Sequence, residues 1–337
     1  MAKLQIKSLQ VFRGCAAFAV VAHHAALSTG AFIGLPVFIE SIFGIGALGV
    51  DFFFVLSGFI IMYAHFNDHH TVFALKHYIF KRLARIYPAY LPVGIAMIVL
   101  YANIPELSAS QDRHYSLLSS FLLIPADGPP AVSVAWTLVH ELMFYSVFLL
   151  FFISKRWLLG GLFAWCIVIF FCNALFTPIG WVRYPLSLMN IEFVLGVCAA
   201  WVVYSYNLVI KGYLFVSVGI VIAGAALVLI TPENIMYLRL VLAVGLALII
   251  IGFAVREQKV SIAWPGLLMM LGNASYSIYL IHNPLLSITQ RLAGRLNMVW
   301  PFAMLFGIVL GLLAGWVYYL IVEQPALDFF RRRAKKI

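Results

Sequence analysis

An arginine and a histidine in the first apolar stretch have the residue types and spacing for chemistry inside a membrane. Arg13 and His24 are eleven residues apart, which on an α-helix places them about 20° apart in azimuth and about 16 Å apart along the axis. Histidine exchanges protons near neutral pH, and arginine pairs with anions. One helical face would thus offer a proton acceptor and an anion partner at two depths. The alternative is structural, with Arg13 extended to the cytoplasmic interface and His24 as a satisfied histidine at the interface.

The second apolar stretch contributes an acidic residue and a hydroxyl group. Asp51 and Ser57 lie in residues 49–59, which read GVDFFFVLSGF. An aspartate after a glycine can cap the N-terminus of a helix. A carboxylate inside an apolar segment otherwise needs a cationic partner, and Arg13 or His24 would serve. The hydroxyl of Ser57 is a candidate donor to an oxyanion.

Two arginines precede the third apolar stretch. Arg82 and Arg85, in the segment KRLARIYP, have i, i+3 spacing and would share one helical face. Two guanidinium groups one turn apart match a polyphosphate, which predicts a phosphate clamp. The alternative is that both arginines only mark a cytoplasmic segment, where basic residues accumulate.

Polar side chains recur at helical spacing in the fourth stretch. Trp136 with His140, and Glu141 with Tyr145, are i, i+4 pairs. A glutamate within a membrane is costly unless it is paired, so Glu141 is a candidate functional residue. Trp136 alone would also fit the aromatic belt at a membrane interface.

A polar run interrupts an apolar stretch late in the chain. Residues 275–284 read SYSIYLIHNP and predict either a kinked pore-lining helix or a break near the outer interface. Glu323 lies two residues before Pro325, where a helix end is the structural alternative. The residues that an apolar environment should penalise are Arg13, His23, His24, Asp51, His140, Glu141, Glu192, His282 and Glu323.

These side chains need an apolar scaffold, and the composition predicts one. Of 337 residues, 64% are hydrophobic and 10% are charged, whereas soluble domains are about half apolar and about a quarter charged. A soluble globule and a disordered chain are thereby excluded. The prediction is an all-α, polytopic transmembrane helix bundle, a single domain over residues 1–337. Ten spans are expected, at residues 9–26, 43–64, 86–102, 133–153, 157–176, 184–204, 213–230, 236–254, 267–288 and 299–322.

The net charge of +10 is explained by membrane topology rather than by nucleic-acid binding. With the N-terminus inside, 16 of the 22 Lys and Arg residues fall in cytoplasmic segments and five, Arg239 among them, in external ones. This bias predicts that both termini face the cytoplasm. The four cysteines lie in apolar stretches without metal-ligand spacing, so no metal site is predicted.

Taken together, these segments resemble the membrane acyltransferase 3 family. The Arg13–His24 spacing resembles the family's first helix, residues 49–59 its second-helix signature, and Arg82 with Arg85 its Arg-x-x-Arg motif. Further matches follow in order at Trp136, Thr137, Leu138 and Glu141, at residues 275–282, and at Glu323, Gln324 and Pro325. Many members carry Asp in place of Gln10 and Ser in place of Thr137. The matches extend over nearly the whole chain.

The resemblance implies an O-acyltransferase that moves an acyl group, usually acetyl, from cytoplasmic acyl-CoA to a sugar hydroxyl of a surface glycan or exopolysaccharide. His24 would be the catalytic base, or a nucleophile through an acyl-imidazole. Asp51 or Glu141 would orient His24 or balance Arg13. The residues expected to bind acyl-CoA are Arg13, Arg82 and Arg85. Those expected to support the site are Ser57, Trp136, Tyr145 and His282.

The same resemblance sets the expected ligands and location. No permanently bound cofactor is expected, because acetyl-CoA or another acyl-CoA is a donor substrate. The expected partners are this donor, the sugar of a surface glycan or lipid-linked oligosaccharide, membrane lipids, and either glycan-synthesis machinery or a second copy in a homo-oligomer. The expected location is the bacterial inner membrane. The alternative is a transporter or flippase of a lipid-linked glycan, which explains the intramembrane charges but not the ordered motifs.

Overall fold

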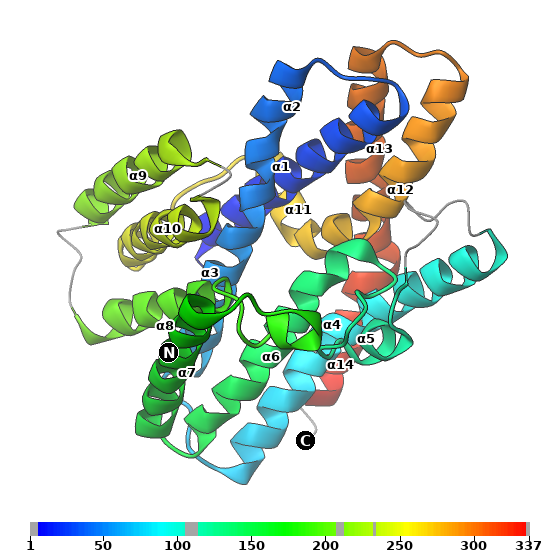
Figure 1. The fold of residues 1–337 in the computed structure, drawn as a ribbon. Helices are drawn as coiled ribbons and strands as arrows, with labels where there is room; N and C mark the ends of the chain where they lie inside the picture. The colour runs from blue at the N-terminus through cyan, green and yellow to red at the C-terminus, as the bar shows by residue number, and fades with distance from the viewer. Residues whose placement is uncertain (1–5, 105–113, 207–211, 232–233, 335–337) are drawn as a thin grey trace. The chain divides into compact units, whose positions relative to one another are not determined.

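The fold is built from helices throughout the part of the chain that the structure describes. The computed structural model describes residues 6–104, 114–206, 212–231 and 234–334, and every regular element in these ranges is a helix (Figure 1). The all-α prediction is therefore confirmed. Five of the Lys and Arg residues counted for topology lie outside these ranges: Lys3, Arg113, Lys211, Lys335 and Lys336.

Eight helical segments are long and apolar enough to cross a membrane. They are Lys7–Phe32, Val37–His65, Val72–Asn103, Ser133–Phe152, Lys155–Leu175, Gly212–Leu229, Ile235–Glu257 and Trp300–Ala334. The predicted spans at 184–204 and 267–288 also form helices. The first of these is shorter, and the second carries polar side chains along its length. The count of ten spans and the cytoplasmic placement of both termini therefore stay predictions.

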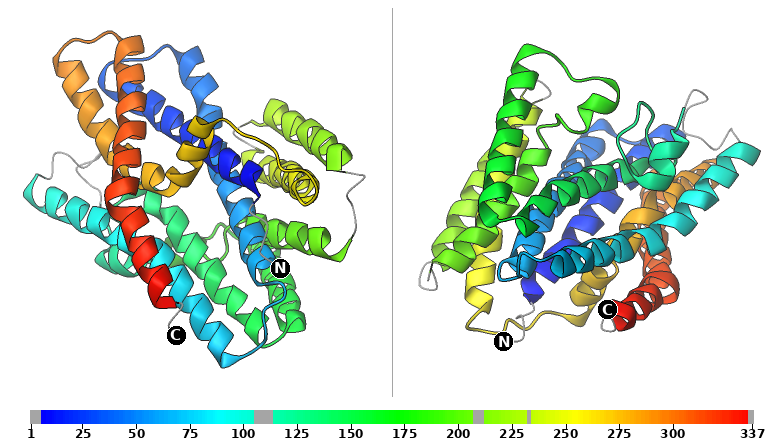
Figure 2. Two further views of the ribbon diagram at one scale, coloured as in Figure 1. Left: turned by 180° about the vertical axis from the view of Figure 1, so that it is seen from behind. Right: turned by 90° about the horizontal axis from the view of Figure 1, so that it is seen from below.

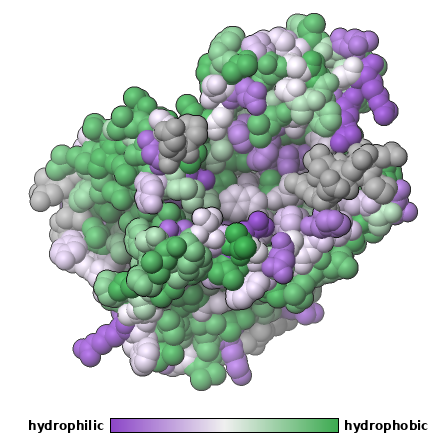
Figure 3. All heavy atoms as spheres, in the orientation of Figure 1, coloured by the Kyte–Doolittle hydropathy of each residue, from purple (hydrophilic) through white to green (hydrophobic). Residues whose placement is uncertain are grey.

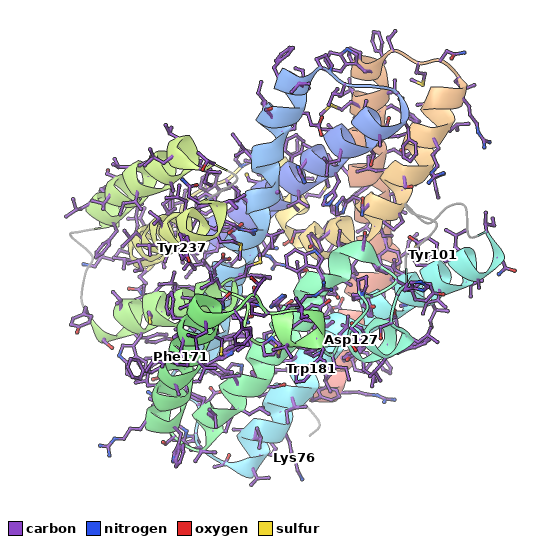
Figure 4. All side chains as sticks on the ribbon, viewed as in Figure 1. Lys76, Tyr101, Asp127, Phe171, Trp181 and Tyr237 are labelled. Carbon is purple, nitrogen blue, oxygen red and sulfur yellow. The ribbon has the colours of Figure 1, made fainter. Side chains whose placement is uncertain are left out.

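The outward-facing side chains of the helices are largely apolar. Phe171 and Tyr237, which Figure 4 labels, are each 64% exposed. Hydrophobic residues cover much of the surface seen in Figure 3. Large exposed apolar areas are unfavourable in water but suit contact with lipid chains. The helices thus combine spanning length with lipid-compatible surfaces.

The chain divides into two compact units, which are described separately. The first comprises Met1–Ala16, Leu48–Thr71 and Met143–Gly272, and the second Ala17–Ala47, Val72–Leu142 and Asn273–Ile337. Two helices contribute several residues to both units, α1 (Lys7–Phe32) and α6 (Trp136–Phe148), and the boundaries also separate the last residue of η1 (Ile45–Leu48) and of α11 (Gly266–Asn273) from the rest. The predicted single domain over 1–337 stays a prediction.

Close helix crossings organise the first unit. Its helices are α3 (Gly49–His65), α7 (Lys155–Leu175), α8 (Asn190–Ser205), α9 (Gly212–Leu229), α10 (Ile235–Glu257) and α11 (Gly266–Asn273), with short turns η4 (Leu149–Phe152) and η5 (Gly180–Arg183). Gly58 of α3 lies against the Phe193 carbonyl of α8, and Gly196 of α8 lies against the Val55 carbonyl of α3. Figure 2 shows α9 beside α10, where Gly219 and Gly245 face each other. Small residues let these backbones approach closely.

A glycine stripe organises the second unit. Its helices are α2 (Val37–Gly44), η1 (Ile45–Leu48), α4 (Val72–Asn103), α5 (Leu117–Leu122), η3 (Ser133–Ala135), α12 (Ser275–Arg295), α13 (Trp300–Tyr318), η7 (Tyr319–Glu323) and α14 (Gln324–Ala334). Helices α12 and α13 lie side by side (Figure 2). Along α13, Gly307 faces Gln290, Gly311 faces His282, and Gly315 faces the Ile278 backbone. This spacing of four residues gives α12 a close packing surface.

Helix α4 begins earlier than predicted. It starts at Val72 rather than near residue 86 and continues through Pro88 to Asn103. Lys76 and Tyr101, labelled in Figure 4, lie near its two ends. Arg82 and Arg85 are consequently one turn apart on a formed helix, as their spacing predicted.

Candidate functional site

Helix α12 connects three other helical segments of the second unit through polar side chains. The Tyr276 hydroxyl donates to the Ile86 carbonyl of α4 at 3.0 Å. The Tyr279 hydroxyl donates to the Val134 carbonyl of η3 at 3.1 Å. It also lies 3.0 Å from the hydroxyl of Thr137, at the start of α6. Residues 275–284 are therefore part of a continuous buried helix rather than a break at an interface.

An ion pair between α4 and η7, which α12 contacts through Ser277, holds one of the predicted phosphate-binding arginines. Arg85 donates to one carboxylate oxygen of Glu323, and the Ser277 hydroxyl donates to the other at 2.6 Å. The Arg85 side chain is 28% exposed, whereas that of Glu323 is 1% exposed. Arg85 also lies over the Tyr276 ring, 5.2 Å from its centroid. Both oxygens of Glu323 are thus satisfied, and the predicted clamp residue has a carboxylate partner.

The short π-helical turn η7 places Glu323 in this pair. Its residues, Tyr319–Glu323, follow α13 directly, so Glu323 is the last residue of the π turn and α winding resumes after it. Single π turns inside helices often occur at functional sites. The structural alternative for Glu323, a helix end before proline, is wrong because α14 continues the helix.

A pair of histidines forms the second polar contact of this unit. His282 Nε2 of α12 lies 3.2 Å from His24 Nδ1 of α1. Each Nδ1 also lies 3.0 Å from the carbonyl one turn earlier, Val20 for His24 and Ile278 for His282. His282 is fully buried, whereas His24 is partly exposed. The ring of His24 is therefore held from one side and reachable from another.

Helix α6 adds an aromatic contact and a carboxylate. The rings of Trp136 and His140 meet edge-on with centroids 5.7 Å apart, which confirms their i, i+4 relation. Glu141 is partly buried and interacts electrostatically with Arg85, Tyr276 and Tyr279. The acidic side chain at this position therefore acts on the same cluster as Glu323. Its predicted role toward His24 or Arg13 stays a prediction.

In the first unit, Asp51 has a different cationic partner from those predicted. Arg239 of α10 donates to both Asp51 oxygens, through Nε at 2.7 Å and Nη2 at 2.9 Å. Asp51 is fully buried and the Arg239 side chain is 18% exposed. Glu192 of α8 is also fully buried and interacts electrostatically with both. Arg239 therefore lies within α10 and belongs to a buried ion pair, and its predicted place on the external side of the membrane stays a prediction.

The remaining predicted residues have local contacts. Arg13 donates to the Gln10 side-chain oxygen at 3.4 Å, and Arg82 lies over the Tyr78 ring with its centroid 5.8 Å away. Tyr145 is buried beside Phe144. Arg13, Asp51, Ser57 and Tyr145 belong to the first unit, and His24, Arg82, Arg85, Trp136, Glu141 and His282 to the second. No cluster of three or more His, Cys, Asp or Glu residues suited to a metal occurs among the described residues.

One buried contact at the start of α1 was missed by sequence reasoning. The Glu257 carboxylate, at the end of α10, accepts from the Ser8 backbone N–H at 3.2 Å and from its hydroxyl at 2.8 Å. Trp264 donates its indole N–H to the same hydroxyl at 3.2 Å. A carboxylate at a helix N-terminus is favourable because it pairs with unsatisfied N–H groups. Glu257 stands close to basic residues in the sequence, so its pattern resembles that of an ordinary loop charge.

Comparisons with known proteins identify the family of the chain. The model of the acyltransferase 3 family, described as an acyltransferase domain, matches residues 6–320. The chain is 29% identical over 313 residues to the exopolysaccharide production protein ExoZ of Rhizobium meliloti (strain 1021), covering 88% of this chain and 93% of that protein. No solved structure matches. This chain has multiple apolar helices of spanning length, and the family model matches nearly all of it. It therefore belongs to the membrane acyltransferase 3 family.

Proposed function

We propose that this protein is an O-acyltransferase of the bacterial inner membrane that transfers an acetyl group from acetyl-CoA to a hydroxyl of an exopolysaccharide sugar. The family match gives the reaction class. The observation that carries the assignment of chemistry is His24, a partly exposed residue on an apolar helix whose ring makes its hydrogen bonds within the described residues through Nδ1. A ring held at one nitrogen keeps the other for proton transfer.

In the proposed reaction, His24 acts as a general base that takes up one proton and returns it. Nε2 takes the proton of the sugar hydroxyl while the hydroxyl oxygen attacks the thioester carbonyl carbon. The tetrahedral intermediate then breaks its carbon–sulfur bond, and the CoA sulfur leaves with the proton returned by Nε2. The products are a sugar ester and CoA-SH, and His24 is regenerated neutral.

Basic side chains of α4 would bind the donor. Arg82 and Arg85 are one turn apart on a formed helix, and guanidinium groups favour phosphate oxygens. Arg85 shares its charge with Glu323, so we expect it to shape the site as well as to bind. Arg82 would then contribute more of the attraction for the CoA phosphates, and Arg13 would be a further anion partner on α1.

The acceptor class comes from the relative. That protein is named for exopolysaccharide production and matches this chain over most of both lengths. A partly exposed histidine on a spanning helix suits a reaction in which a cytoplasmic donor meets an acceptor at or beyond the membrane. An exopolysaccharide sugar, either lipid-linked or already part of the polymer, would be an acceptor in that location.

Mass spectrometry of exopolysaccharide tests this function against the transport alternative. A strain lacking the protein is complemented with wild type or with His24→Gln, and immunoblotting confirms equal membrane levels. We expect wild type alone to restore ester-linked acetyl groups while both strains export equal polysaccharide. Polysaccharide that is retained in the deletion strain would support a transporter instead. Full acetylation by His24→Gln would contradict the assigned chemistry.

A further inference from the structure

The hydrogen bonds of His282 determine which of its nitrogens carries a proton. Its Nδ1 lies 3.0 Å from the Ile278 carbonyl oxygen, and a carbonyl can only accept. Nδ1 therefore carries the hydrogen. In a neutral imidazole the other nitrogen is then an acceptor, so Nε2 of the fully buried His282 presents a lone pair.

The same reasoning fixes His24. Its Nδ1 lies 3.0 Å from the Val20 carbonyl oxygen and 3.2 Å from His282 Nε2. Both neighbours are acceptors, so Nδ1 carries the hydrogen and shares it between them. Among the described residues, every hydrogen bond of the His24 ring uses Nδ1. Nε2 of His24 accordingly keeps its lone pair.

We propose that His282 is a positioning residue that fixes the tautomer and orientation of His24, so that Nε2 of His24 acts as the base. This inference rests on the proposed function. In hydrolase triads a third group holds the imidazole in the correct tautomer and stabilises the imidazolium that forms. Here the third group is an imidazole, with its own tautomer set by Ile278.

The surroundings of His282 hold it rigidly in this role. Gly311 of α13 packs against it, with 3.6 Å between the His282 Cβ and the place of a Cβ on Gly311. The Tyr279 ring, one turn earlier, has its centroid 5.8 Å from that of His282, and its hydroxyl is tied to Thr137. The backbone of α13 thus approaches the base of the His282 side chain to ordinary van der Waals distance. The positioning group is therefore supported from two helices.

The titratable neighbours of the pair are few. The His23 ring centroid is 5.1 Å from that of His24, and Glu40 of α2 interacts electrostatically with His23 rather than with the pair. A neutral acceptor stabilises an imidazolium less than a carboxylate does, and Val20 keeps its own share of the Nδ1 hydrogen. We therefore expect loss of His282 to lower kcat by about 10- to 100-fold, less than loss of a general base itself.

Two substitutions separate positioning from packing. His282→Gln keeps a side-chain oxygen near the place of Nε2 and can accept from His24, whereas His282→Met fills similar space without a strong acceptor. Each variant is purified in lipid nanodiscs, and transfer is measured with radiolabelled acetyl-CoA and unacetylated exopolysaccharide from a deletion strain. We expect His282→Met to lose kcat about 10- to 100-fold with an unchanged KM for acetyl-CoA. His282→Gln should stay within a few-fold of wild type.

The controls distinguish this inference from the proposed function. His24→Gln is measured beside them, and thermal unfolding in detergent verifies that each variant is folded. If His24→Gln transfers acetyl at the wild-type rate, the base role of His24 in the proposed function fails, and if the wild type transfers no acetyl, the proposed function itself fails. If His24→Gln is inactive and folded His282→Met retains the wild-type kcat, only the positioning role is overturned. Equal loss in folded His282→Met and His282→Gln would also overturn it, because the acceptor would not be what matters.

Discussion

Two buried polar pairs, one in each unit, differ in what they leave unused. Arg239 satisfies both oxygens of Asp51 with two parallel hydrogen bonds. In contrast, His24 and His282 meet through one nitrogen each, and the His24 ring remains partly exposed. We call Asp51–Arg239 a closed pair, because both carboxylate oxygens already accept hydrogen bonds. Such a pair stabilises helix packing but leaves no carboxylate oxygen for a substrate. An open pair has a nitrogen available for proton transfer, so position in an apolar helix alone does not identify a catalytic group.

The comparison predicts that the closed pair matters most for stability. Arg239→Met leaves Asp51 buried without its cationic partner. It also removes the positive charge that interacts with the buried Glu192. We expect a loss of about 3–5 kcal/mol in the free energy of unfolding, because breaking a buried pair strands a charge. Thermal unfolding in detergent and the yield in membranes measure this. The double variant Asp51→Asn, Arg239→Met removes both charges and should recover part of the loss, and no recovery would argue against a stranded charge.

Breaking the Arg85–Glu323 pair should cost less stability than breaking the Asp51–Arg239 pair. Arg85→Met strands the buried carboxylate of Glu323, but solvent reaches the pair because Arg85 is 28% exposed. We expect about 2–3 kcal/mol of lost stability, with part restored in the double variant Arg85→Met, Glu323→Gln. On the folded double variant, a raised KM for acetyl-CoA would support a donor-binding role for Arg85. An unchanged KM would leave Arg85 as a structural group.

The glycine stripe of α13 should have a smaller effect. Gly315→Ala brings a Cβ against the Ile278 backbone of α12, and we expect about 1–3 kcal/mol of destabilisation through overpacking. Gly224→Ala on α9 is the matched control, because nothing lies within 4 Å of a Cβ there. The control should be neutral or slightly stabilising, since alanine favours helix over glycine. Equal melting temperatures for the two variants would contradict close packing at Gly315.

The helices could be predicted from the sequence because hydrophobicity and spacing are local. The apolar runs, the shared face of Arg82 and Arg85, and the Trp136–His140 pair all depend on residues within a few turns. His282 was identified as a supporting residue from its place in a polar run of an otherwise apolar segment.

The partners could not be predicted because they come from distant parts of the chain. Asp51 and Arg239 are 188 residues apart, and His24 and His282 are 258 apart. Which charge meets which depends on helix packing, so counting Arg239 as a topological charge did not reveal its partner Asp51. The spacing of Gly307, Gly311 and Gly315 was a readable signal for close packing of α13 on another helix.

The most direct test of the central claim is the acetyl-transfer rate of purified His24→Gln beside Asp51→Asn. Both variants are measured with acetyl-CoA and unacetylated exopolysaccharide, at equal amounts of folded protein. Since general base catalysis contributes about 10²- to 10⁴-fold, we predict that His24→Gln loses at least about 100-fold in kcat, and that folded Asp51→Asn stays within about tenfold of wild type. A large loss in Asp51→Asn together with a near-normal kcat in His24→Gln would contradict the account, because the reactive group would then lie at the other pair.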